Sequence, residues 1–234
     1  MTEKLLIPSI DMRLSSLLEV NRRREMDLEA RSQAKKSRST ITLSREFGCE
    51  AYPVAERLRE LLEKKSGETW VLLDKSLLEQ VASNHNLSED ILQKLGEKNI
   101  FLDEMLATFS PRWKSDKDHF RLLCRHIVSL ASAGNVIIVG RGSAFITQSL
   151  KNCHHFRMFA SLKYKICSIS SRLNITSEEA EKMIAKKQRQ RDTFIRDFLD
   201  RDAHDLNVYN LVFNNDKNSP EKIARTIMEY VMSA

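Results

Sequence analysis

The run Val136-Ile137-Ile138-Val139 constrains the fold more than any other stretch of this chain. Consecutive β-branched residues are typical of a strand that is buried on both faces, as inside a parallel sheet. Gly134-Asn135 end the helical pattern before the run, and Gly140-Arg141-Gly142 follow it. The run therefore predicts a central parallel strand, which needs further strands and covering helices from other parts of the chain.

Strand patterns and helical patterns alternate along the rest of the chain. Further strands are expected at residues 40–43, 70–74, 156–160 and 209–213. Helices are expected at residues 53–65, 76–83, 88–95, 100–109, 120–133, 162–173, 177–187 and 219–232. This alternation predicts an α/β fold of three layers (α/β/α), in which helices cover both faces of a parallel sheet.

The N-terminal residues 1–38 form an arm and linker that differ in composition from the α/β domain expected over residues 39–234. The 234 residues, 41% hydrophobic and 30% charged, suit one soluble domain with such an appendage. A short apolar stripe in the arm has helical spacing: Ile10, Leu14, Leu17 and Leu18. The stripe either docks on the domain or on a second subunit, giving a homodimer, or belongs to a disordered tail.

The formal net charge of +6 favours anionic partners. The excess lies mainly in basic tracts at residues 22–24, 35–38 and 186–191, which are either solvated helix faces or a nucleic-acid surface. Trp113 and Tyr164 are too isolated to form a stacking platform, so nucleic acid is not the expected partner. A membrane is not expected either, because the longest apolar run is far too short to span one.

Cysteine usage and the N-terminus bear on the compartment. The four cysteines are scattered and form no C-x-x-C pair, and no signal-peptide pattern opens the chain. These features predict free thiols in a reducing, cytoplasmic setting. Cys153-His154-His155 lack a second ligand pair at suitable spacing, so no metal site is expected there.

The stretch from Ile41 to Leu58 reads as a strand, a loop with one glycine, and a helix. Pro53 suits the first helical position, where its missing N–H has no intrahelical partner. A strand that turns tightly into a helix directs the free N–H groups of the helix at whatever lies over the loop, which is a common cradle for phosphate. The alternative is a strand–helix corner that binds nothing.

The loop departs from the phosphate-binding motif Gly-x-x-x-x-Gly-Lys-Ser/Thr. Laid from the strand without gaps, the motif positions hold Arg45, Glu50, Ala51 and Tyr52. The phosphate-binding lysine is missing, and the Glu50 carboxylate would repel an anion unless it is turned away. Only Gly48 lies where such a loop needs a residue without a side chain.

Four stretches in this order resemble the cytidylate-kinase-like family of the P-loop nucleoside monophosphate kinase superfamily, over residues 40 to 232. They are residues 41–58 as first strand, loop and helix; 72–75 as second strand with its acid; 134–142 as central strand and Gly-Arg turn; and 191–214 as lid and last strand. The resemblance implies a parallel sheet of P-loop nucleotide kinase type with a helical insert near residues 84–133 and a lid near 174–205.

The resemblance also implies a reaction, the transfer of the γ-phosphoryl group of ATP to a nucleoside monophosphate, with Mg²⁺. Carried over by position, ATP would be held by Ser44, Arg45, Gly48, Cys49 and, at the adenine end, Asn214. Such chemistry depends mainly on positioning and charge neutralisation. The corner and the lid are therefore expected to supply cations and N–H groups.

On the acceptor side, the resemblance implies Asp74 and Arg141 as substrate-binding residues. Arg141 is also implied as a catalytic residue, together with Arg191 and Arg196 of the lid. A planar guanidinium suits a monophosphate, and lids of this kind exclude water. Structural alternatives exist: Asp74 could cap a helix, and the lid arginines could belong to a solvated face.

Three functions remain open from the sequence. The first is an active kinase for a pyrimidine monophosphate such as CMP. The second is a catalytically weak or inactive kinase-fold protein with a binding or regulatory role, favoured by Glu50 and Ala51 in the loop. Gln188, at a lid position where such kinases usually have an acid, is a further departure. The third, a nucleic-acid binder, predicts affinity that falls steeply with salt.

Overall fold

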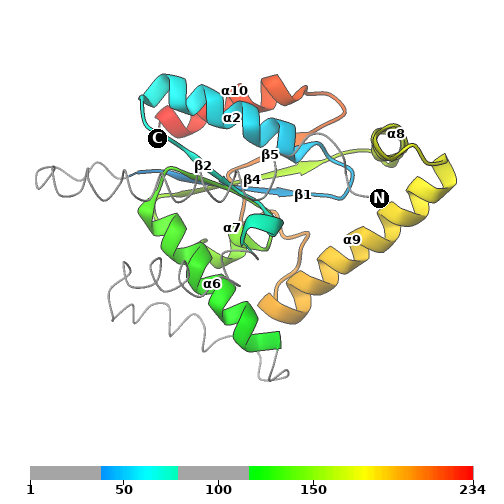
Figure 1. The fold of residues 1–234 in the computed structure, drawn as a ribbon, viewed down its shortest axis with the longest axis horizontal. Coiled ribbons are helices and arrows are strands. Elements are labelled where there is room, and N and C mark those ends of the chain that lie inside the picture. The colour runs from blue at the N-terminus through cyan, green and yellow to red at the C-terminus, as the bar shows by residue number, and fades with distance from the viewer. Residues whose placement is uncertain (1–37, 79–115, 234) are drawn as a thin grey trace, which may run out of the picture.

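The computed structural model describes residues 38–78 and 116–233, and its centre is a single parallel sheet (Figure 1). Five strands lie in the order β2-β3-β1-β4-β5 in this described part. Their bounds are β1 Thr40–Arg45, β2 Val71–Leu73, β3 Val136–Val139, β4 Cys153–Phe159 and β5 Leu211–Asn214. Because β1 pairs with both β3 and β4, its end lies in the middle of the carboxyl edge of the sheet.

Helices cover both faces of the sheet, as Figure 1 shows. On one face α10 (Pro220–Ser233) packs beside α2 (Ala51–Ser66), and on the other lie α6 (Asp116–Ala133) and the short α7 (Ser143–Ile146). The next two helices, α8 (Leu162–Leu173) and α9 (Ser177–Leu199), pack together as a hairpin that projects past the end of the sheet. We call these two helices the α8–α9 hairpin.

Apolar packing divides between the two faces of the sheet. Leu43 and Phe156 belong to the cluster under α2 and α10, and Ile138 belongs to the cluster against α6 and the end of α9. These three side chains are fully buried. At about 25 cal/mol per Å² of apolar surface, each such side chain contributes roughly 1.5–3 kcal/mol to folding. A third, smaller cluster lies within the α8–α9 hairpin.

The predicted α/β architecture of three layers is confirmed, with differences in detail. Strand β3 has the predicted bounds and lies between two strands, but β1 occupies the centre. Helix α2 begins at Ala51, so Pro53 is its third residue rather than its first. Proline is tolerated there because none of the first four helical N–H groups has an intrahelical partner. The four-residue helix α7 was not predicted.

Several sequence predictions lie outside the described residues. These are the arm up to residue 37, the helices expected at 88–95 and 100–109, and most of the helix expected at 76–83. Within the described residues, no helix has the length and apolar character that a bilayer crossing requires.

His155 of β4 makes stability depend on pH. Its side chain is buried, Nδ1 lies 2.8 Å from Thr42 Oγ1, and burial followed by the charge of His154 lowers its pKa to about 4. The unfolded chain binds the proton near pH 6.5, so it holds more protons than the native state between these values. The free energy of unfolding is therefore expected to fall as pH drops from 6.5 toward 4. Urea unfolding across this range should show it, with a shallower slope in His155→Gln.

Candidate anion-binding site

The corner between β1 and α2 is formed by residues 46–50, which we call the corner loop. Gly48 has φ +99°, a conformation that side chains disfavour, and a Cβ added there would lie 2.8 Å from Lys165 Cβ. Helix α2 starts directly after the loop, with no side-chain cap on its first turn. Its N-terminus therefore presents the positive end of the helix dipole at the carboxyl edge of the sheet.

The carboxylate of Glu50 is turned away from this helix terminus and toward α8. Its Oε1 accepts a hydrogen bond from Ser168 Oγ at 3.4 Å. Burial, followed by the same carboxylate, raises the pKa of the Tyr164 hydroxyl to about 12. The Glu50 backbone N–H donates to Asn215 Oδ1 at 2.9 Å. The Glu50 carboxylate, which could repel a bound anion, is thus held by α8.

The turn after β3 holds Arg141 in an unusual conformation. Gly140, Arg141 and Gly142 all have positive φ, at 82°, 56° and 68°. For arginine the left-handed region costs about 1–2 kcal/mol, and such strain concentrates at functional sites. The guanidinium lies 5.3 Å from the centre of the Phe194 ring on α9, and burial lowers its pKa. The strained turn therefore directs a cation into the space between the sheet and α9.

Arg45, the last residue of β1, reaches the same turn. Gly140 N–H donates to Leu43 O at 3.1 Å, which places the two strand ends side by side. A Cβ added at Gly140 would overlap Arg45 Nη1, so the guanidinium lies directly on the Gly140 backbone. Arg191 Nη1 in turn donates to the Arg45 carbonyl at 3.1 Å. Three arginines from β1, the β3 turn and α9 thus meet at one edge.

Two lysines complete the group, which we call the cation cluster: Lys75, Arg141, Lys187 and Arg191. Burial lowers the pKa of Lys75, and Arg141, Lys187 and Arg191 lower it further. In the described part of the chain neither lysine forms an ion pair with a carboxylate. Like charges held together from three elements destabilise one another unless an anion joins them. The arrangement is therefore a candidate anion-binding site.

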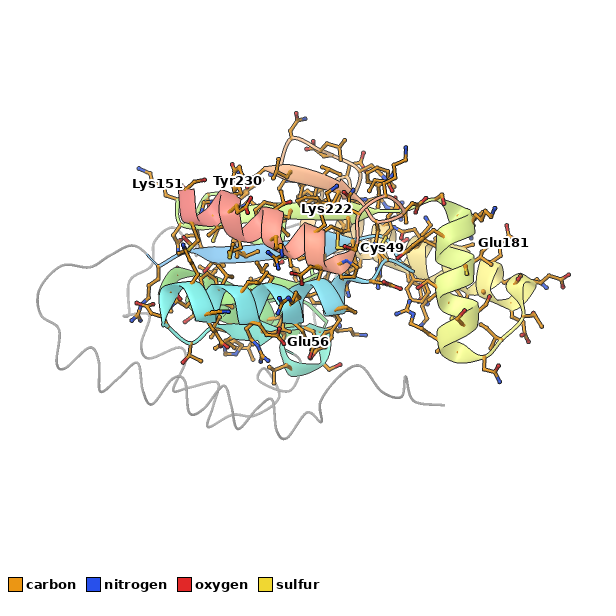
Figure 2. All side chains as sticks on the ribbon, turned by 90° about the horizontal axis from the view of Figure 1, so that it is seen from above. Cys49, Glu56, Lys151, Glu181, Lys222 and Tyr230 are labelled. Atoms are coloured by element: carbon orange, nitrogen blue, oxygen red, sulfur yellow. The ribbon has the colours of Figure 1, made fainter. Side chains whose placement is uncertain are left out.

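Of the remaining predicted site residues, some lie near the corner loop and others do not. Ser44 continues β1 into the corner, and Cys49 is buried, with a pKa raised to about 12 by burial and then by Glu46. Asp74 Oδ1 accepts from Leu77 N–H at 3.0 Å, as a helix cap would. Arg196 is 69% exposed and pairs with Asp197, so the structure does not bring it to the cluster. Figure 2 shows Cys49 where the α8–α9 hairpin meets the sheet.

Asn214 forms hydrogen bonds within its own turn, whereas its neighbour Asn215 reaches the corner loop. Asn214 Oδ1 accepts from Asp216 N–H at 2.9 Å and so shapes its own turn. Asn215 is 3% exposed and accepts from the Glu50 N–H. Asn215, Lys75 and Lys187 are site residues that the sequence reasoning missed. Lys75 follows a predicted strand and could have been found by the position that singled out Arg141; the other two carry no such signal.

Metal ligands do not gather at this edge in the described part of the chain. Among the described residues, no group of three or more His, Cys, Asp or Glu side chains is placed to hold a metal ion. The imidazole of His155 is within hydrogen-bond distance of Thr42 Oγ1.

Comparison with known proteins shows the family of this chain. A sequence model of the cytidylate kinase-like family matches residues 40–217. The chain belongs to this family. A cytidylate kinase of Pyrococcus horikoshii is 26% identical over 162 residues, which are 68% of this chain and 80% of that protein. The family match begins at β1 and ends after β5, so it contains the whole cation cluster.

The described part of the chain folds as a five-stranded parallel sheet with helices on both faces. The crystal structure of an uncharacterized protein from Eubacterium ventriosum aligns with a TM-score of 0.67 at 18% identity, covering 84% of this chain and 99% of that chain. That likeness shows the fold alone. Membership of the family supports a kinase-like, nucleotide-binding function.

Proposed function

We propose that this chain is a phosphotransferase that moves the γ-phosphoryl group of ATP to a nucleoside monophosphate, with CMP as the acceptor. The observation that carries the proposal is the cation cluster at the carboxyl edge of the sheet. Ligands of open α/β sheets bind outside the carboxyl ends of the strands. Phosphoryl transfer needs charge neutralisation at such a place more than it needs covalent chemistry.

The residues divide by position into two groups. The N-terminus of α2, with Ser44, Gly48 and Cys49, would line the ATP phosphates, and the segment from Asn214 would meet the adenine. Arg141 and Lys75, at the ends of β3 and β2, would hold the acceptor phosphate, with Asp74 at the mouth of its pocket. Arg191 and Lys187 of α9 would lie over the transferring group. Closure of the site against water would come from α9.

The described residues fit the phosphates of ATP, because cations and helix N–H groups are the partners that phosphate oxygens need. They supply no ready cage for Mg²⁺, and Tyr52 stands where the motif has its metal-binding hydroxyl. Mg²⁺ keeps several waters and binds largely through substrate phosphates in such sites, so it would arrive with the nucleotide. When bound it would neutralise charge on the phosphates. Free cysteines suit the cytoplasm, where ATP is available.

A second candidate is a protein that binds nucleotide without turning it over. Ala51 occupies the position of the motif's lysine, and Glu50, though turned away, precedes it. Loss of one preorganised phosphate contact costs about 2.7–4 kcal/mol at a transition state. In an active kinase, Arg45 or the cation cluster would have to replace the phosphate contact that the lysine makes.

Turnover separates the two candidates. The Tm of the full chain should be measured with Mg²⁺-ATP and with each nucleoside monophosphate. We expect ATP and CMP to raise the Tm most, since ligands that bind only the native state stabilise it. The best pair should then give ADP in a coupled assay. Stabilisation without ADP from any pair would favour the binding protein. Absence of stabilisation by every nucleotide would contradict both.

A further inference from the structure

The corner loop is connected to the α8–α9 hairpin through one glutamine. Gln188 Oε1 accepts the Phe47 backbone N–H at 2.8 Å, and Gln188 Nε2 donates to Asp192 Oδ1 at 2.8 Å. The backbone N–H can only donate, so the orientation of the amide group is determined. Asp192, one turn further along α9, holds the other end of the amide in place.

The side chain of Phe47 enters the apolar cluster of the hairpin. It packs with Ile169, Ala180 and Ile184, which come from both helices and are at most 4% exposed. The Arg191 guanidinium lies 5.1 Å from the centre of the Phe47 ring. The loop thus packs a partly buried residue against the core of the hairpin.

A third contact joins the loop to α8. The stem of Lys165 crosses Gly48, and its Nζ pairs with Glu46 Oε2 at 2.8 Å. The Lys165 side chain is 13% exposed and that of Glu46 is 21% exposed, so this ion pair is largely shielded from water. Both helices of the hairpin therefore hold the loop, α8 through Glu46 and Gly48 and α9 through Phe47.

Glutamine meets a requirement here that an acid would not. The side chain must accept from an N–H and donate to a carboxylate at the same time. A carboxylate at position 188 would still accept from Phe47 but would repel Asp192. An apolar side chain would leave a part-buried N–H without its partner.

We propose that Gln188 is a positioning residue, whose amide fixes the Phe47 N–H so that the corner loop takes its shape from the α8–α9 hairpin and moves with it. The importance of that shape rests on the proposed function, because the same loop would hold the ATP phosphates. The hairpin is then not a lid that swings over a rigid loop. The α8–α9 hairpin and the corner loop then move together as one rigid unit.

Amide hydrogen exchange on the full chain tests this without nucleotide. In Gln188→Leu, exchange at residues 46–49 should speed up at least tenfold, while β1 and β3 keep their protection. Gln190→Leu is the matched control, because Gln190 is exposed on the same helix two residues away; its loop exchange should equal that of the wild type. The double variant Gln188→Glu with Asp192→Asn restores an acceptor and a donor and should recover protection.

Unchanged loop exchange in Gln188→Leu, or the same acceleration in Gln190→Leu, would overturn the proposal. So would a double variant as unprotected as Gln188→Leu. Titration of each variant with Mg²⁺-ATP gives a separate readout: the affinity should fall about tenfold in Gln188→Leu and recover in the double variant. If the wild type binds no nucleotide, the proposed function fails while the exchange result still decides the role of Gln188.

Discussion

Replacing Arg141 with alanine is expected to slow phosphoryl transfer by about 10²–10³-fold while leaving Tm nearly unchanged. The guanidinium is held by a strained turn beside Arg45 and lies against the Phe194 ring. Removing it takes one positive charge from the place where the transferring group would gain negative charge. The measurement is ADP release with ATP and CMP, alongside a thermal melt.

Two further substitutions sharpen that experiment. Arg141→Lys keeps the charge but loses the planar fork, so an intermediate loss is expected. Arg189→Ala removes the same charge from an exposed position on α9 and should change the rate by less than about twofold. A rate in Arg141→Ala equal to that of Arg189→Ala would remove Arg141 from the site. If the wild type shows no turnover, the affinity for CMP provides the same comparison.

The parallel sheet was predictable because its strands carry local signals. The run from Val136 to Val139 is apolar throughout, and β3 has those bounds in the structure. The order of strands was not predictable from local pattern, since crossovers decide which strands become neighbours. Helix α7 was missed because four residues are too few for a helical period to show.

The site was predictable only where a residue follows a strand. Arg45 and Arg141 end β1 and the β3 turn, and neighbouring parallel strands bring such residues together. Lys187 and Arg191 share one face of α9 by their spacing of four residues, but whether that face meets the sheet depends on how the hairpin docks. In the sequence, Gln188 was notable only because such kinases usually have an acid at that position. Its role as a bridge depends on Phe47, which is 141 residues away.

Gly142 and Gly67 offer a matched pair for measuring how closely α9 is held to the sheet. Both have φ of 68°, so alanine at either position incurs the same left-handed strain, about 1 kcal/mol. A Cβ at Gly67 meets nothing within 4 Å, whereas one at Gly142 would overlap Leu199 Cδ1 and lie 3.2 Å from Ile195 Cδ1. These two side chains of α9 lie in the densely packed core, so we expect the helix to shift to make room.

Gly142→Ala is therefore expected to lower the free energy of unfolding by about 2–4 kcal/mol, which adds overpacking to strain, against about 1 kcal/mol for Gly67→Ala. Urea unfolding of the two variants measures the difference. The same shift of α9 would carry Lys187 and Arg191 away from Arg141, so only Gly142→Ala should also weaken nucleotide binding. Equal destabilisation by the two substitutions would mean that α9 can move away from the turn with no loss in the free energy of unfolding. The cation cluster would then owe its geometry to the ligand rather than to the packing of Leu199 and Ile195 on the turn.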